Sequence, residues 1–264
     1  MNIIDTHCHV YPDAIAARAA KGIGTFYDYP VAADGRVETL LAAGAAAGVA
    51  HHVVCSVATT PHQVASINRF IRSTVDAHPG RLTGLGALHP DSPDQAADVE
   101  LVLSLGLKGV KLHPDIQQVA IDDPRYLEIF SLLEGRLPVL CHLGDARYDF
   151  SNPARVKRVL ERFPRLTMIG AHFGGWSIWR EAAEALHGCA GLLVDCSSSL
   201  FALEPEEAAA LIRLYGAERV LFGVDYPMWT PKDEVARFDA LPLTESERAC
   251  ILYRNAEALY GIRL

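Results

Sequence analysis

The sequence lacks the features that mark disulfide-bonded, nucleic-acid-binding and membrane proteins. Its six cysteines are spread along the chain, without the paired spacing of a disulfide framework or a zinc motif. Basic residues do not dominate, because 24 Lys and Arg stand against 32 Asp and Glu, which gives a net charge of −8. This acidic balance argues against nucleic acid or an anionic membrane as the main partner. We therefore expect reduced thiols in a cytoplasmic protein.

Long apolar runs and phosphate-binding loops are also missing. The most apolar stretch, residues 40–50, ends at His51 and His52 and is too short to span a bilayer. No charged segment followed by an apolar core opens the sequence, so we expect no targeting segment and no membrane association. The region after the first predicted strand has no Gly-rich loop, which disfavours a doubly wound dinucleotide-binding sheet.

The sequence does contain a repeated alternation of short apolar runs and amphipathic helical segments. Eight such runs recur at intervals of roughly thirty residues, at 1–10, 52–57, 82–88, 107–114, 138–142, 166–172, 192–196 and 220–225. Continuous apolar strands that alternate with helices are typical of buried parallel strands. Eight of them predict a closed (β/α)8 TIM barrel of the α/β class. We expect a single barrel domain over 1–264, with a lid-like loop at about 11–35.

Histidines follow these predicted strands at their carboxyl ends, where the active site of such a barrel lies. Side chains alternate along a strand, so His7 and His9 point to one face while Cys8 points away from them. The later strands end in His89, Lys111, His113, His142, His172 and Asp225. Imidazole and carboxylate groups suit zinc, manganese or iron. This clustering predicts a metal site.

Several motifs resemble the amidohydrolase superfamily, in particular its amidohydrolase-related branch, which includes aminocarboxymuconate-semialdehyde decarboxylase-like proteins. They are DTHCHV (5–10), GVKLHP (109–114), CHLGD (141–145), FPRLTMIGAHFGG (163–175), FGVDYP (222–227) and NAEALYG (255–261). The resemblance implies one divalent metal ion, zinc or alternatively manganese, with His7, His9, His142 and Asp225 as ligands. It also implies that His172 is a catalytic residue beside the metal.

Lys111 has two interpretations. Two-metal hydrolases of the superfamily use a carboxylated lysine from the fourth strand, which makes Lys111 a candidate bridge to a second metal ion. Alternatively, Lys111 is a buried amine that needs a carboxylate partner such as Asp5, and the site holds one metal ion. We expect His113, two residues further on, to face the substrate.

Three further residues are candidates for substrate binding. Arg147 and Tyr148 follow the fifth predicted strand, and a guanidinium group pairs well with a substrate carboxylate. Trp176 follows the sixth strand and is expected to form a wall of the pocket. A solvated arginine and a tryptophan packed in the core are the competing interpretations.

We expect a metal-dependent hydrolase that acts on a small-molecule amide, lactone or related carbonyl compound. A bound metal ion generates hydroxide from water, Asp225 moves the proton and His172 stabilises the developing oxyanion. The alternative is a metal-dependent, non-oxidative decarboxylase of a small aromatic or unsaturated carboxylic acid. A third class is a barrel that binds a metal or ligand without turnover. The expected partners are a small-molecule substrate and, from the resemblance, a second copy of the chain.

Overall fold

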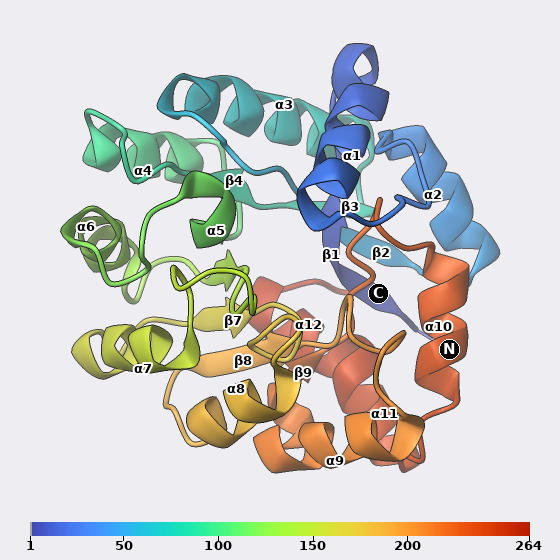
Figure 1. Ribbon diagram of the computed structural model, residues 1–264. Coiled ribbons are helices and arrows are strands. Elements are labelled where there is room, and N and C mark those ends of the chain that lie inside the picture. Colours follow the sequence, from blue (N-terminus) through green and yellow to red (C-terminus); the bar gives the residue numbers. More distant parts are fainter. Residues whose placement is uncertain (1) are drawn as a thin grey trace.

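A closed barrel of parallel strands forms the centre of the molecule in the computed structural model, which describes residues 2–264 (Figure 1). The strands are β1 (Ile4–His9), β2 (His51–Cys55), β3 (Leu82–Gly84), β4 (Gly86–Ala87), β5 (Val110–Leu112), β6 (Val139–Cys141), β7 (Met168–Gly170), β8 (Leu192–Asp195) and β9 (Val220–Leu221). They pair in parallel in the orders β1-β2-β3 and β4-β5-β6-β7-β8-β9. One predicted strand is divided at Leu85 into β3 and β4, and the amide of Leu85 still bonds to β2. The eight predicted strand positions are therefore confirmed.

Backbone hydrogen bonds between β1 and the segment that contains β9 close the barrel. The Thr6 amide donates to the Phe222 carbonyl over 2.9 Å, and the Asp225 amide donates to the His7 carbonyl over 2.8 Å. A closed sheet of parallel strands joined by helices is the predicted (β/α)8 TIM barrel. Closure also brings the first and last strands, which carry His7 and Asp225, into direct contact.

Helices surround the strands on the outside of the barrel (Figure 1). They are α1 (Asp13–Tyr27), α2 (Val37–Ala46), η1 (Pro61–Gln63), α3 (Val64–Ala77), α4 (Gln95–Ser104), α5 (Pro114–Gln117), α6 (Pro124–Leu133), α7 (Pro153–Arg162), α8 (Trp179–Leu186), α9 (Pro205–Tyr215), η2 (Ala217–Arg219), α10 (Pro231–Asp239), α11 (Glu245–Ala249), η3 (Cys250–Arg254) and α12 (Asn255–Tyr260). Many begin with proline, whose fixed φ and missing N–H are tolerated at the first helical position. Among residues 2–264, no helix has the length and apolar character needed to cross a membrane.

Two apolar layers explain why the strand sequences are uninterrupted hydrophobic runs. The inner layer fills the barrel and includes Ile4, Val53, Leu140 and Ile169. The outer layer lies between strands and helices and includes Cys8, Val54, Leu112, Ile129 and Val194. Because successive side chains on a strand point to opposite layers, both sets have to be apolar.

The helix α1 replaces most of the loop predicted at 11–35, so that expectation is wrong. The segment is rich in alanine, the strongest helix former, and its buried side chains are those of Ala16 and Ala20. Small residues on the buried face produce no periodic pattern of large apolar side chains. Residues 28–36, after the helix, do form an irregular connection.

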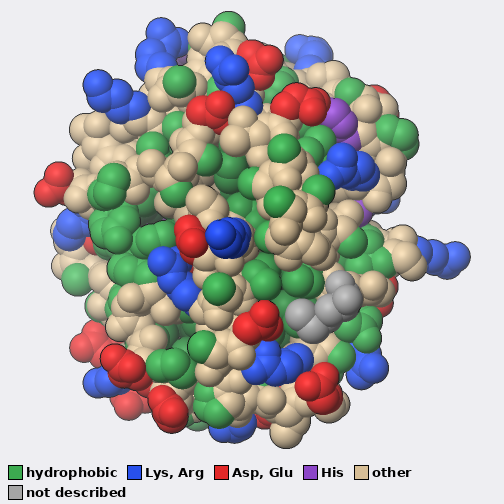
Figure 2. All heavy atoms as spheres, turned by 90° about the vertical axis from the view of Figure 1, so that its right-hand side faces the viewer, with side chains coloured by type: hydrophobic (Ala, Val, Ile, Leu, Met, Phe, Trp, Pro, Cys, Tyr) green, Lys and Arg blue, Asp and Glu red, His purple; other side chains and the backbone are tan. Residues whose placement is uncertain are grey.

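Acidic and basic side chains alternate over the face of the molecule shown in Figure 2, with hydrophobic side chains between them. Such mixing gives no strong field of one sign over that face.

Candidate metal centre

A cavity of about 590 Å³ lies at the carboxyl ends of the strands. The side chains from the strand ends that line it are His7, His9, Lys111, His113, His142, His172 and Asp225. Apolar side chains from α1 and α3 line it as well, among them Ile15, Ile23, Phe26, Ile67 and Phe70. The structure thus brings the predicted strand-end residues together in one place, except His89, which does not line the cavity. Apolar walls with a few convergent polar groups are typical of small-molecule sites.

Three of these side chains converge closely enough to share a metal ion. The Nε2 atoms of His7 and His9 lie 3.2 Å apart, and Oδ1 of Asp225 lies 3.5 Å from each. Ligand atoms about 2.1 Å from a tetrahedral ion are separated by roughly 3.4 Å. The donor set therefore fits one divalent ion.

The orientation of His7 is set by Asp195 at the end of β8. The Nδ1–H of His7 donates to Oδ2 of Asp195 over 2.9 Å, which leaves the lone pair on Nε2 facing the cavity. Burial opposes ionisation of Asp195, but His7, His172 and the Ser197 hydroxyl hold the pKa of its carboxyl well below the usual range. A carboxylate behind a ligating histidine fixes its tautomer and strengthens it as a ligand.

Asp225 is held by its second carboxylate oxygen. The Ser198 hydroxyl donates to Oδ2 over 2.6 Å and itself accepts a hydrogen bond of 2.9 Å from Nε1 of Trp229. Oδ1 therefore remains directed at His7 and His9. Asp225 and Ser198 both have positive φ angles, of 62° and 46°, and such strained backbone is concentrated at functional sites.

His172 is a neutral imidazole beside this group. Burial is the main cause that lowers the pKa of His172 to about 4, so the ring carries no charge at neutral pH. Its Nδ1–H donates to the Ser197 carbonyl over 3.0 Å, which leaves Nε2 as an acceptor, 3.1 Å from Nδ1 of His142. His172 can therefore receive a proton at Nε2 and return it.

A chain of polar contacts joins α1 to β5 and β6. The Ile116 amide donates to Nδ1 of His113, which places the proton of this neutral ring on Nε2, 2.8 Å from the Tyr27 hydroxyl. The Tyr27 hydroxyl lies 3.3 Å from Nδ1 of His142. Nε2 of His142 is 3.6 Å from Asp115, beyond normal hydrogen-bond distance, and has no partner among the described residues.

His142 is thus placed beside the group of His7, His9 and Asp225 rather than within it. Its nearest polar contacts are Tyr27 and His172, and its ring stacks on His113 with centroids 4.0 Å apart. Its role as a metal ligand stays a prediction. The role of His113 in substrate binding does too, although His113 lines the cavity.

Lys111 does not form the ion pair with Asp5 that one of its two interpretations predicted. Its Nζ lies 3.0 Å from Nε2 of His7, inside the barrel, and the side chain is buried. Asp5 lies on the other side of β1, in contact with Cys8 and His52. Within residues 2–264, no carboxylate lies within ion-pair distance of Lys111. This leaves its amine directed at the group of His7, His9 and Asp225.

Arg147, Tyr148 and Trp176 support α1 from outside the cavity. The Arg147 guanidinium pairs with Asp145 over 2.7 Å and lies 5.0 Å from the ring centroid of Phe26. Tyr148 stacks on Phe26 and is 39% exposed, and Trp176 packs against α1 as well. None of the three is among the residues that line the cavity in the described chain. Their roles in substrate binding stay predictions.

Arg18 and Tyr27 of α1 line the cavity and were missed because the segment was interpreted as a loop. The cavity-lining residues of this helix are Ile15, Arg18, Ala19, Gly22, Ile23, Phe26 and Tyr27. Their spacing of three and four residues is the signature of one helix face. Within residues 2–264, Arg18 forms no ion pair, so its charge is available to a ligand.

The model of a protein family described as Amidohydrolase matches residues 4–262. The chain belongs to this amidohydrolase family. A search of curated proteins finds no sequence match.

Solved structures share the fold of this chain over nearly its whole length. An uncharacterised TIM-barrel protein of Bordetella bronchiseptica superposes with a TM-score of 0.82 at 23% identity, covering 99% of both chains. The 5-carboxyvanillate decarboxylase of Sphingomonas paucimobilis gives 0.75 at 19% identity, also with 99% of both chains covered. A dihydroxybenzoic acid decarboxylase of Polaromonas, solved with manganese and 2-nitroresorcinol, gives 0.75 at 16% identity, covering 100% of this chain and 98% of that one.

Proposed function

We propose that this amidohydrolase-family protein is a metal-dependent, non-oxidative decarboxylase of a small aromatic or unsaturated carboxylic acid. The observation that carries the proposal is the convergence of His7, His9 and Asp225 at the end of a cavity with apolar walls. Similarity in fold to decarboxylases of carboxyvanillate and dihydroxybenzoate supports decarboxylation over the hydrolysis expected from the sequence. Manganese in one of these enzymes makes manganese as reasonable a candidate as zinc.

The chemistry requires a carbon–carbon bond to break without oxidation. The bond to the carboxylate carbon breaks, its electron pair stays on the substrate carbon, that carbon takes a proton, and CO2 leaves. A divalent ion held by His7, His9 and Asp225 would supply a Lewis acid for an anionic substrate oxygen. His172 and Asp225 are the groups placed to carry the proton, His172 through Nε2.

The cavity walls match a flat, largely apolar substrate. Phe26 and Ile23 of α1 and Ile67 and Phe70 of α3 offer apolar surface and restrict the access of water. Arg18 is the cation on the α1 side of the cavity that has no carboxylate partner among the described residues. We propose that it attracts an anionic substituent of the substrate.

Hydrolysis remains the second candidate because of Lys111. Its amine lies 3.0 Å from Nε2 of His7, where a carboxylated lysine could bridge two metal ions. Such a pair of ions activates water for attack on a carbonyl group. Counting metal ions per chain separates the two proposals.

The test combines metal analysis with product detection. Protein loaded with Mn²⁺ or Zn²⁺ is analysed by plasma mass spectrometry and incubated with hydroxybenzoates, carboxylated methoxyphenols, lactones and amides. We expect about one ion per chain and release of CO2 from at least one aromatic acid. Two ions per chain with cleavage of a lactone or amide would instead establish hydrolysis. The absence of both activities in metal-loaded protein would contradict catalysis by this centre.

Variants connect that activity to the site. His172→Asn should lower kcat by about 10²- to 10⁴-fold, the usual contribution of a positioned acid or base, while metal content stays unchanged. Asp225→Asn should lower both metal content and turnover. His187→Asn, at the end of α8 and outside the cavity, is the matched control and should retain full activity.

A further inference from the structure

β1 contains one residue more than the part of β2 beside it. Asp5 pairs with His52 and Cys8 pairs with Val54, so three steps along β1 oppose two along β2. An extra residue of this kind is a β-bulge, which redirects side chains and is common beside active sites. In regular alternation, His7 would point outward like Asp5.

The bulge turns the histidines inward. His7 and His9 line the cavity, whereas Cys8 packs in the layer between the barrel and the helices. Asp5 lies in that same outer layer, with His52, whose ring abuts Gly44 of α2. Around the bulge, the inner face of β1 therefore carries the candidate metal ligands, and its outer face carries a group of polar side chains.

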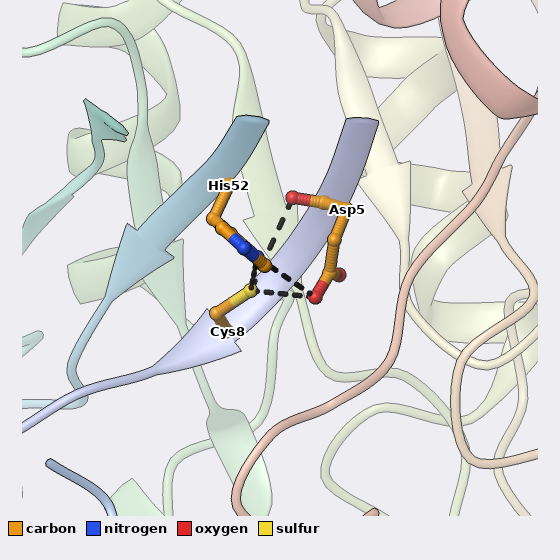
Figure 3. Close-up of side chains that lie close together, drawn as sticks. All are labelled: Asp5, Cys8 and His52. Atoms are coloured by element: carbon orange, nitrogen blue, oxygen red, sulfur yellow. Dashed lines mark hydrogen bonds and ion pairs between the residues drawn. The ribbon is translucent and has the colours of Figure 1, made fainter. Parts of the chain in front are cut away.

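The buried carboxylate of Asp5 accepts hydrogen bonds on both oxygens. Oδ1 accepts the amide of His7 over 3.2 Å and the amide of Val224 over 2.9 Å. Figure 3 shows the other side, where the Cys8 thiol donates to Oδ2 over 2.9 Å and Nδ1 of His52 lies 3.4 Å from it. One carboxylate thus joins the bulge of β1, the neighbouring β2 and the residue just before Asp225.

We infer that Asp5 is a positioning residue for the metal ligands. It holds the bulge that turns His7 and His9 inward, and it holds the segment that presents Asp225 against β1. The inference rests on the proposed metal centre, because it assigns Asp5 the task of fixing the mutual positions of those ligands. Four donors on one buried carboxylate compensate for its removal from water.

The same three side chains in Figure 3 invite a different interpretation, namely a second metal site. Ligand atoms of Asp5, Cys8 and His52 lie within 4.8 Å of one another. Metal binding would require the thiolate, whereas the Cys8 thiol donates a hydrogen bond to Oδ2 of Asp5 over 2.9 Å. Oδ1 of Asp5 is moreover already occupied by two backbone amides. The hydrogen-bonded network is therefore favoured.

The central experiment uses Asp5→Asn in the full chain. An amide has one acceptor oxygen, so one pair of donors loses its partner. Affinity for Co²⁺ is measured by competition with a chelator, together with the visible spectrum of bound Co²⁺, which reports ligand geometry. We expect 10- to 100-fold weaker binding, the usual cost of losing a group behind the ligands, and a changed spectrum.

A matched control separates positioning from general stability. Glu234→Gln alters another fully buried carboxylate, on α10, which is bonded to Arg237 rather than to β1. It should change the melting temperature of the metal-free protein but leave the affinity and spectrum of Co²⁺ unchanged. Asp5→Asn with native affinity and spectrum would overturn the inference. Failure of the unmodified protein to bind Co²⁺ would contradict the proposed metal centre instead.

Two further variants complete the test. Thr6→Val removes the hydroxyl that donates to the Phe222 carbonyl over 2.8 Å. If Asp5→Asn does not fold, this variant tests whether the bulge fixes the positions of the ligands. Weaker Co²⁺ binding by Thr6→Val supports the inference, and native binding contradicts it. Cys8→Ala should bind as many ions as the unmodified protein, with affinity within about threefold, since Oδ1 of Asp5 keeps both amides. Loss of one ion per chain would establish a metal site at Cys8 and overturn the inference.

Discussion

Nζ of Lys111 lies 3.0 Å from Nε2 of His7, the atom that would bind the metal ion. A lysine ammonium at this position repels a divalent cation and competes for the lone pair of His7. We therefore predict that Lys111→Met, which keeps the length of the side chain and removes its charge, binds one Mn²⁺ or Zn²⁺ per chain about tenfold more tightly, equivalent to roughly 1.4 kcal/mol. Chelator competition measures the affinity. A fall from two ions per chain to one would show instead that Lys111 bridges a pair of metals.

Ser198→Ala tests how Asp225 is held. Without the hydroxyl, Oδ2 loses its 2.6 Å hydrogen bond, and the carboxylate is free to rotate away from His7 and His9. We expect metal affinity to fall about tenfold, at the lower end of the effect usual for such groups. Isothermal titration with Mn²⁺ gives the value. Ser199→Ala, whose hydroxyl bonds to the Ser197 carbonyl, is the neighbouring control and should retain native affinity.

The spacing of His7 and His9 could be interpreted from the sequence because alternation holds over two residues. The face on which they lie could not, since it depends on an extra residue near Thr6 and on Asp5, which bonds to Val224 from the far end of the chain. Such long-range contacts leave no periodic signal. The inward turn of the histidines is therefore a property of the closed barrel.

Asp195 and Ser198 were missed for a related reason. Asp195 is the last residue of β8 and Ser198 follows that strand, whose end carries no histidine. Their role is apparent only when His7 and Asp225 lie beside them. The error at α1 has a local origin, because alanines on its buried face hide the helical period. Strand positions were predicted well, since burial on both faces makes each strand a continuous apolar run.

Arg18→Gln should impair substrate binding more than chemistry. Arg18 lines the cavity on α1 without a carboxylate partner among the described residues, whereas the metal-binding group is formed by strand-end residues. We predict that KM for a substrate with a second anionic group rises about tenfold while kcat changes less than threefold, as expected for loss of one charged hydrogen bond. Steady-state kinetics of CO2 release measure both constants. Arg213→Gln, on α9 and outside the cavity, is the control, and an equal rise in KM there would show that Arg18 has no special role.

The stability of the metal-free protein should depend on Glu234 as pH rises. Burial is the main cause that raises the pKa of Glu234 to about 7, against an ordinary value of 4.5. A carboxyl with a raised folded-state pKa stabilises the fold fully at pH below about 4.5, and this contribution is lost as pH rises through about 7. Relative to the unmodified protein, Glu234→Gln should therefore gain on the order of 2 kcal/mol between pH 5 and pH 8.5. Urea unfolding at both pH values tests this, and a constant difference would contradict it.

Gly44→Ala should destabilise the fold through His52. A methyl group at Gly44 of α2 would collide with the His52 imidazole, which is buried and held by Asp5 and cannot turn away without breaking that contact. Overpacking of this kind costs about 1–3 kcal/mol, more than the gain of up to about 1 kcal/mol from replacing a helical glycine with alanine. Gly22→Ala in α1 is the matched control, because among the described residues no atom apart from its chain neighbours and the backbone of its own helix lies within 4 Å of its Cβ position. Urea unfolding should show a loss for Gly44→Ala and a gain for Gly22→Ala; equal gains would mean that α2 moves freely away from His52.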